Sequence, residues 1–359
     1  MTPEGLVAGP RGRRLLLAFA VASERAVRGE GVERPLGTAA FDVSFRLAKD
    51  HGHAITRFGW GATATRSQYT VGDVVSQLAL VPLVTATSEL LVEALSASVD
   101  SAMYWQEPDG DDLLCAVPEV CAALARIAEH LVDSPVVQAW AAPLDPADQW
   151  QIAWQDCETT PRTDLGRWRE KVLAEELKAR RERPTSPRAN WSGEWWSHPP
   201  HGLSTSTRAF GDAGPYGLWL VEDALGWEAA TAWRLEIDPS ARIYEIDCAG
   251  AWAALCLEFP LVVTASRRHD WYRTTGRAGP WVIPDWSLVA DHYDGVHLTI
   301  AGYLAAATTA IEAGDAASVI AGWGPDATWW FNDTARPVGE PVGWRARRDG
   351  GQLPWAPTR

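Results

Sequence analysis

The sequence predicts an α+β protein, in which a mixed, largely helical N-terminal domain precedes an antiparallel-leaning α+β domain. Apolar residues with helical spacing dominate much of the first half, whereas short runs that alternate with period two, separated by turns, follow residue 191. Residues 183–190, Arg-Pro-Thr-Ser-Pro-Arg-Ala-Asn, are rich in proline and serine and lack apolar periodicity. We therefore expect two domains, residues 1–183 and residues 191–359.

The N-terminal half is expected to start with strands and to continue with helices. Arg14–Val21 contains a short apolar run typical of a buried strand, and Phe41–Leu47 alternates apolar and polar residues as a half-buried strand does. Turns are expected at residues 51–53 and 59–61. From about Val71 the pattern becomes helical, and helices are predicted over residues 90–104, 117–131 and 165–183.

The C-terminal half is expected to combine short strands with short helices. Thr231–Asp238 and Ile243–Asp247 flank a Pro-Ser-Ala-Arg turn, and this arrangement predicts a β-hairpin. Leu218–Asp223 is an apolar run that ends in two carboxylates and is expected to be a strand. Further strands are expected at residues 203–208, 295–300, 318–321 and 328–331, and helices at residues 252–259 and 286–292.

The charge balance disfavours nucleic acid as a partner. The 359 residues include 46 acidic and 32 basic side chains, a formal net charge of −14, whereas nucleic-acid binders carry an excess of positive charge. A small anionic ligand is compatible with this composition. No stretch approaches the roughly 20 apolar residues of a membrane span. The five cysteines lack CxxC spacing and are expected to be reduced thiols, so we expect a cytoplasmic protein without a membrane partner.

Tryptophan is unusually abundant. The chain has 21 Trp beside 7 Phe and 7 Tyr, and its many Gly and Pro beside 2 Met are typical of a bacterium with GC-rich DNA. The tryptophans either fill core positions that phenylalanine fills elsewhere or wall an aromatic pocket. Glu194–His201, with two tryptophans and two histidines, is a candidate for such a wall or for a plug at the domain interface.

A Ser-Thr-Ser strand opens the C-terminal half. Ser204-Thr-Ser206, followed by Thr207 and Arg208, precedes the two period-two runs described above. This order resembles the central part of ADP-ribosyltransferase catalytic domains, in which the strand carrying Ser-Thr-Ser shapes the nicotinamide pocket. The Glu-x-Glu or Gln-x-Glu signature of that family has no counterpart downstream. The resemblance implies that Ser204 and Ser206 contact the substrate.

The same resemblance implies NAD+ as substrate, with transfer or hydrolysis at the nicotinamide–ribose bond. Arg208 would then orient a phosphate, and Tyr244 or Trp233 would stack on nicotinamide. A carboxylate, either Glu222 or Glu245, would stabilise the transition state, which resembles an oxocarbenium ion. The alternative interpretation of the Ser-Thr-Ser segment is an edge strand rich in β-branched residues.

Residues 264–276 form the densest group of ionisable and aromatic side chains, and we expect a polar loop there. Arginines hold phosphates or carboxylates through bidentate hydrogen bonds, aromatic rings stack on bases, and a histidine transfers protons near neutral pH. The alternative is a solvated loop with local ion pairs. The candidate substrate-binding residues are Arg267, Arg268, Trp271, Tyr272 and Arg273, and the candidate acid or base is His269.

A further candidate pair lies at a turn between a helix and a strand. Asp294 and His297 are expected to meet across the Asp-Gly turn and to contact the substrate, whereas the alternative is a hydrogen-bonded core histidine. No set of His, Cys, Asp and Glu has the spacing of metal ligands, so no metal site is expected.

The motifs lead to one expected function and one alternative. The phosphate loop GxxxxGK[ST], a GxGxxG turn, GxSxG and HExxH are absent. We expect a bacterial enzyme that acts on a nucleotide-like or other anionic small molecule, NAD+ being the candidate. The alternative is a non-enzymatic module that binds a protein or ligand through a tryptophan-rich surface. The N-terminal half is a candidate for binding a protein partner.

Overall fold

The computed structural model describes residues 1–359 apart from 30–32, 55–68, 156–161, 224–226, 347–354 and 359. It combines helices with antiparallel-leaning sheets, which confirms the predicted α+β class. The chain forms two compact units, which are described separately below: unit 1 contains residues 1–98 and 108–138, and unit 2 contains residues 99–107 and 139–359. The segment expected to link two domains, residues 183–190, lies within unit 2. The two expected domains, residues 1–183 and 191–359, therefore have other bounds than these two units, and they stay a prediction.

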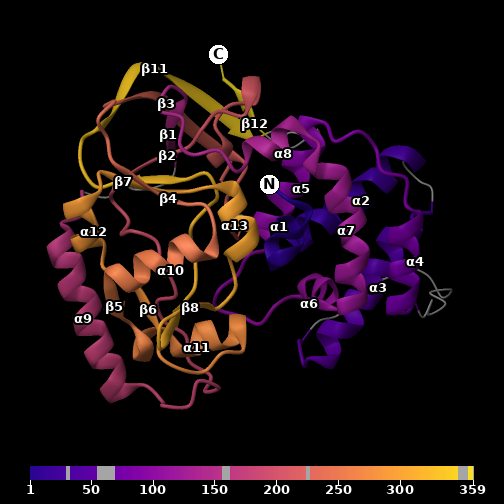
Figure 1. The fold of residues 1–359 in the computed structure, drawn as a ribbon, viewed down its shortest axis with the longest axis horizontal. Coiled ribbons are helices and arrows are strands. Elements are labelled where there is room, and N and C mark those ends of the chain that lie inside the picture. Colours follow the sequence, from indigo (N-terminus) through magenta and orange to yellow (C-terminus); the bar gives the residue numbers. More distant parts are fainter. Residues whose placement is uncertain (30–32, 55–68, 156–161, 224–226, 347–354, 359) are drawn as a thin grey trace. The chain divides into compact units, whose positions relative to one another are not determined.

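The described part of unit 1 is helical. Proline occupies the first helical position of four of its helices, where its missing N–H costs nothing because that group has no partner inside the helix. The helices are α1 (Pro3–Ala8), α2 (Pro10–Arg28), α3 (Pro35–Asp50), α4 (Val71–Leu80), α5 (Ser88–Asp100), α6 (Gly110–Ala116) and α7 (Pro118–Val132), and α8 (Pro135–Ala139) leads into unit 2 (Figure 1).

Both strands expected near the N-terminus are wrong. Arg14–Val21 lies within α2, and Phe41–Leu47 lies within α3. The apolar residues of these segments follow helical spacing once their neighbours are included, as the burial of Leu36, Ala39, Ala40 and Val43 shows. Phe41 is 56% exposed, so it does not belong to a buried strand face. The turn expected at residues 59–61 lies outside the described residues.

The core of unit 2 contains two four-stranded sheets. The first is antiparallel throughout, in the order β1-β3-β11-β12, and the second has the order β2-β10-β7-β4. In the second sheet β2, β10 and β7 are antiparallel, whereas β4 is parallel to β7. The strands are β1 (Gln149–Trp154), β2 (Ser204–Ser206), β3 (Ala229–Ile237), β4 (Ile243–Ile246), β7 (Gly295–Leu298), β10 (Thr328–Trp330), β11 (Ala335–Ala346) and β12 (Trp355–Pro357).

The predicted hairpin is wrong although its two strands are present. β3 pairs with β1 and β11, whereas β4 pairs with β7 in the other sheet. The turn between them therefore joins two sheets. The run Leu218–Asp223 is also no strand, because a short 3-10 helix at Tyr216–Leu218 leads into irregular chain. β1 was not predicted.

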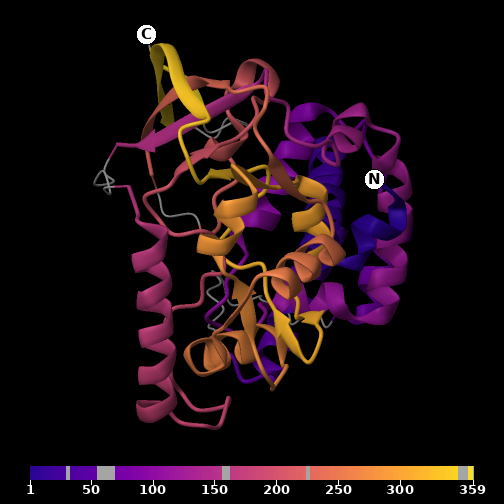
Figure 2. The same ribbon diagram turned by 60° about the vertical axis from the view of Figure 1, so that its left-hand side comes forward.

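Helices and two small hairpins complete unit 2. The long helix α9 (Leu165–Glu182) runs along one side of the unit beside α11 and α12 (Figures 1 and 2). β5 pairs with β6, and β8 pairs with β9. The remaining elements are α10 (Ala249–Glu258), β5 (Pro260–Val262), α11 (Thr264–Thr275), β6 (Val282–Pro284), α12 (Trp286–His292), α13 (Ile300–Ala306), β8 (Ile311–Ala313), β9 (Ala316–Ser318) and a 3-10 turn at Gly211–Ala213.

The two sheets of unit 2 join where the Ser-Thr-Ser strand ends. The backbone N–H of Trp150 donates to the carbonyl of Thr207 at 2.8 Å, and the N–H of Thr207 donates back at 3.0 Å. This pair continues the edge of β2 onto β1. Residues 204–208 therefore lie at the corner between the sheets, and this corner positions the candidate site.

The described residues include no membrane-spanning helix and no disulfide. No helix among them has the length and apolar content needed to cross a bilayer. Their four cysteines, Cys115, Cys121, Cys248 and Cys256, are free thiols, and Cys157 lies outside the described residues.

The contact between α3 and α6 in unit 1 gives a stability test. A Cβ at Gly110 would lie 2.3 Å from the carbonyl oxygen of Ser44, whereas a Cβ at Gly72, on α4, would meet only the Thr70 hydroxyl at 3.5 Å. We expect Gly110→Ala to lower the free energy of unfolding by about 1–3 kcal/mol through overpacking. Gly72→Ala should raise it by about 0.5–1 kcal/mol because alanine restricts the unfolded chain. Urea denaturation of both variants measures this, and equal effects would contradict the close packing of α3 on α6.

Candidate functional site

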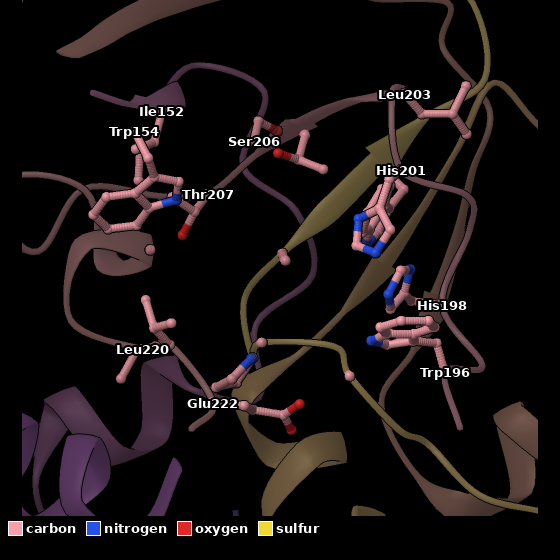
Figure 3. A pocket seen from close by; sticks show the side chains of 18 of the residues that line it. Ile152, Trp154, Trp196, His198, His201, Leu203, Ser206, Thr207, Leu220 and Glu222 are labelled. Carbon is pink, nitrogen blue, oxygen red and sulfur yellow. The ribbon is translucent and has the colours of Figure 1, made fainter. Parts of the chain in front are cut away.

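A cavity of about 680 Å³ lies in unit 2 at the corner between the sheets. Figure 3 shows its wall: Trp154 and Thr207 on one side, Trp196, His198 and His201 on the other, and Glu222 below. We call it the aromatic cavity because six of its lining residues are tryptophans: Trp150, Trp154, Trp195, Trp196, Trp227 and Trp329.

The Ser-Thr-Ser strand provides one wall of the aromatic cavity. Thr205, Ser206 and Thr207 line it, whereas Ser204 lies on the same strand but is not part of the lining. The Ser206 hydroxyl donates to Gln149 Oε1 at 2.6 Å and accepts from the indole N–H of Trp330 at 2.9 Å. These bonds fix the strand against both sheets, so its position is set before a ligand binds.

Two neighbouring carboxylates, Glu222 and Asp223, line this cavity, and tyrosine hydroxyls hold Glu222. Its Oε1 accepts hydrogen bonds from the hydroxyls of Tyr104 at 2.6 Å and Tyr303 at 2.9 Å. Both tyrosines are fully buried, and the ring of Tyr104 stacks on Trp195 with a centroid distance of 5.5 Å. The two rigid donors hold the carboxylate in one orientation at the cavity wall.

Two histidines form the wall opposite the Trp154 side. His198 stacks on Trp329 with an interplanar angle of 8°, and its centroid lies 4.6 Å from that of His201. Burial, together with His201, lowers the pKa of His198 to about 3, so its ring is neutral at physiological pH. Burial also lowers the pKa of His201. The expectation that Glu194–His201 walls a pocket is confirmed.

A glycine allows the Trp195–His198 segment to approach closely. Gly322 has φ +74°, and a Cβ there would lie 2.5 Å from Trp196 and 3.0 Å from His198. The N–H of Ser197 donates to the carbonyl of Ala321 at 3.0 Å, and the N–H of Ala321 donates to the Ser197 hydroxyl at 2.8 Å. A side chain at position 322 would therefore displace the wall of the cavity.

Residues 264–275, expected to be a loop, form helix α11, and this expectation is wrong. The Glu176 carboxylate accepts hydrogen bonds from the N–H groups of Ala265 and Ser266, both at 2.9 Å, and so satisfies two donors of the first turn. The segment has many charged residues, which is typical of a loop, but in the helix the side chains of Arg267, His269 and Asp270 are buried in unit 2.

The candidate residues of α11 hold the segment that precedes the Ser-Thr-Ser strand. Arg267 donates to the carbonyl of Trp196 at 3.3 Å, and the Trp271 indole N–H donates to the carbonyl of Trp195 at 2.9 Å. Arg273 donates to the carbonyl of Trp191 at 2.8 Å and pairs with Asp270. Arg268 and His269 contact the carbonyls of Thr185 and Pro187, and the Tyr272 hydroxyl accepts from Arg188. Only Arg267 of this group lines a cavity that is described below.

Arg208, Glu245 and His297 come together in a second, buried group. Arg208 donates to Asp326 at 2.6 Å, and His297 Nδ1 lies 2.6 Å from Glu245 and its Nε2 lies 3.8 Å from Asp326. Burial opposes ionisation of Asp326, but hydrogen bonds and charges from His297 and Arg208 outweigh it and lower the pKa of that carboxyl. For His297, the two carboxylates likewise outweigh burial and raise its pKa. In this group each basic side chain, Arg208 or His297, lies next to a carboxylate of Asp326 or Glu245. None of the four residues lines the aromatic cavity.

The remaining candidates lie away from the aromatic cavity. Asp294 accepts from the backbone of Arg242 at 2.8 Å and from Asn332 at 2.7 Å, and so holds a turn. Among the described residues it makes no hydrogen bond or ion pair with His297, so the expected meeting of the two across the turn is wrong. Tyr244 donates to the carbonyl of Ala251 at 2.7 Å, and neither Tyr244 nor Trp233 is among the lining residues.

Sequence reasoning missed the two tyrosines that hold Glu222 and the central role of Asp326. Tyr104 lies 118 residues from Glu222, and Tyr303 lies 81 residues from it, so no local spacing relates them. Asp326 has φ +62°, which is uncommon for a residue with a side chain, but its sequence neighbours give no signal of that. Among the described residues, no group of three or more His, Cys, Asp or Glu is placed to hold a metal ion.

A comparison of the chain with protein-family models, with curated proteins and with solved structures found no match.

The neutral His198 gives a stability test in acid. An unfolded histidine has a pKa of ~6.5. Below that pH the unfolded chain therefore binds a proton at residue 198, whereas the folded chain binds it only near pH 3. The free energy of unfolding should therefore fall between these pH values by up to about 1.4 kcal/mol per pH unit on account of this residue. His198→Asn should flatten this part of the profile relative to the exposed control His292→Gln, as measured by urea denaturation at several pH values. Parallel profiles for the two variants would contradict a neutral, buried His198.

Proposed function

We propose that the chain is an enzyme that binds a nucleotide-like molecule, NAD+, in the aromatic cavity and cleaves its nicotinamide–ribose bond by hydrolysis or ADP-ribosyl transfer. One observation carries the proposal: the Ser-Thr-Ser strand and the oriented carboxylate of Glu222 line the same cavity. This is the arrangement that the resemblance to ADP-ribosyltransferases implies for its strand and for one of its two candidate carboxylates.

The aromatic walls suit the nicotinamide ring of NAD+. That ring is flat and positively charged, and indole faces attract cations by about 0.5–2 kcal/mol each when water is excluded. The described residues of the wall include no arginine or lysine that would repel such a ring. Thr205 lines one edge of the cavity, and its hydroxyl is available to orient an amide or a ribose hydroxyl.

Glu222 supplies the charge that the reaction needs. As the C1′–N bond breaks, its electron pair goes to the nicotinamide nitrogen, which leaves as a neutral ring, and positive charge develops on the ribose. A fixed carboxylate stabilises that charge without reorganising. Water or an acceptor hydroxyl then forms the new bond to C1′ and releases a proton to solvent. The hydroxyls of Tyr104 and Tyr303 position the carboxylate, and neither takes part in bond making.

Glu245 and Arg208 have other roles in this proposal. Both belong to the buried charged group with Asp326 and His297, and the Arg208 guanidinium is occupied by Asp326 and by the carbonyl of Ala139. That group keeps the strands behind the cavity in register. Of the two carboxylates considered, Glu222 is therefore the catalytic residue.

The test is release of nicotinamide from NAD+, followed by liquid chromatography. We expect Glu222→Gln to lower the rate about 100-fold or more while the KM changes little, because the carboxylate acts in the transition state. The exposed control Glu258→Gln should leave the rate unchanged. Tyr104→Phe keeps the ring that stacks on Trp195 and removes one hydrogen bond to the carboxylate, and it should lower the rate about tenfold.

Two outcomes would overturn the proposal. One is a wild-type chain that neither releases nicotinamide nor shows quenching of tryptophan fluorescence by NAD+. The other is quenching without turnover, which would favour a non-enzymatic ligand-binding module. Circular dichroism of the variants shows whether they fold.

A further inference from the structure

A second cavity, of about 690 Å³, lies beside the aromatic one in unit 2. Its lining comes from the start of α9 and the residues before it, from the Glu194–His201 segment, from α11 and from β6. Four of the lining residues are cationic, so we call it the basic cavity: Arg162, Arg167, Lys171 and Arg267.

The lining of the basic cavity has an excess of positive charge. Among the described residues of the lining, four cations face two carboxylates, Asp164 and Glu194, an excess of two positive charges in a chain whose net charge is −14. Asp164 accepts the N–H of Arg167 and caps α9, so it is committed to the helix. Such a concentration of positive charge attracts anions against the charge of the chain as a whole.

One of these cations is built into the interior. Arg267 is 3% exposed, and its guanidinium donates to Glu194 at 3.1 Å and to the carbonyl of Trp196 at 3.3 Å. These bonds fix a buried positive charge at the wall of the cavity. Arg162 is likewise engaged, with Asp333 at 2.6 Å and the carbonyl of Phe331 at 3.0 Å.

The other two cations keep their bonding capacity for a ligand. Arg167 and Lys171 are four residues apart and therefore share a face of α9. Within the described part of the chain, the Arg167 guanidinium makes no hydrogen bond or ion pair. The Lys171 ammonium forms an ion pair with Glu194 at 3.8 Å, which is too long for a hydrogen bond and leaves its N–H groups unbonded to that carboxylate. Both can turn their N–H groups to an anion that enters the cavity.

The two cavities meet at shared side chains. Trp196, His198 and His201 line both of them. A ligand with its ring in the aromatic cavity therefore has the basic cavity next to it, across these rings. The aromatic cavity suits the flat ring of a nucleotide, and the cationic lining of the basic cavity suits its phosphate groups.

We propose that the basic cavity binds the phosphate groups of the ligand, with Arg167 and Lys171 as the groups that contact them and Arg267 as a fixed charge behind them. The ligand class is then a phosphorylated molecule with a flat ring, such as a dinucleotide or a nucleoside diphosphate sugar. This inference rests on the proposed function for the identity of the ring, but the anion site itself has its own test.

The test compares ligands with and without phosphate on two pairs of variants. Calorimetry gives the affinity of ADP-ribose and of inorganic pyrophosphate, and tryptophan quenching gives the affinity of nicotinamide. We expect the double variant Arg167→Gln, Lys171→Gln to weaken ADP-ribose and pyrophosphate at least tenfold and to leave nicotinamide unchanged. The control Arg181→Gln, Lys178→Gln removes the same charges from equally exposed positions on the same helix that do not line the cavity, and it should change none of the three affinities.

Salt provides a second measurement. The affinity for pyrophosphate should fall between about 50 and about 200 mM salt in the wild type, and fall less in the double variant, because fewer charges are screened.

The outcomes separate the two proposals. Unchanged pyrophosphate affinity in the double variant, an equal loss in the control pair, or no pyrophosphate binding by the wild type would each overturn the anion site. Pyrophosphate binding that depends on Arg167 and Lys171, in a chain that does not cleave NAD+, would support the anion site and contradict the proposed function.

Discussion

The anchoring of one segment, residues 191–201, to helix α11 is the constraint on which the rest of the site depends. This segment has little secondary structure of its own, so its backbone groups need partners from elsewhere. Arg267 and Trp271 bind the carbonyls of Trp196 and Trp195, and Asp270 accepts the N–H of Gly193 and the hydroxyl of Ser192. Because both cavities use the rings of this segment, the contacts of α11 determine the shape of both.

Two groups of buried polar and charged side chains in unit 2 find their partners locally. Arg208, Asp326, His297 and Glu245 connect residues of the second sheet with the end of the Ser-Thr-Ser strand, and Glu176 satisfies the first turn of α11. Buried ionic groups of this kind contribute little net stability, but removing one partner leaves an uncompensated charge, which is costly. They therefore favour one arrangement of the strands around the cavity over alternatives.

Part of the fold followed from the sequence. The α+β class was predicted, and so were the helices α7, α9, α10 and α12, with ends within a few residues of those in the structure. The strands expected in α2 and α3 failed because short apolar or alternating runs do not distinguish a strand from part of a longer helix. The loop predicted at residues 264–276 was wrong for another reason. Helix α11 buries Arg267, His269 and Asp270, so its buried face lacks the apolar pattern by which a helix is predicted.

The sequence by itself determined that Ser204–Thr207 form a strand end in a tryptophan-rich half and that Glu222 follows an apolar run, since these are local patterns. It also offered Glu194–His201 either as the wall of a pocket or as a plug at a domain interface. Only the tertiary structure decided that Glu222 lines that pocket in a fixed orientation, because the tyrosines whose hydroxyls hold it, Tyr104 and Tyr303, lie far from it in the chain. The tertiary structure likewise turned the arginines of α11 inward to carbonyl groups and left Arg167 and Lys171 of α9 at the second cavity. Periodicity records which face of an element is buried, but it carries no information about the partner that covers that face.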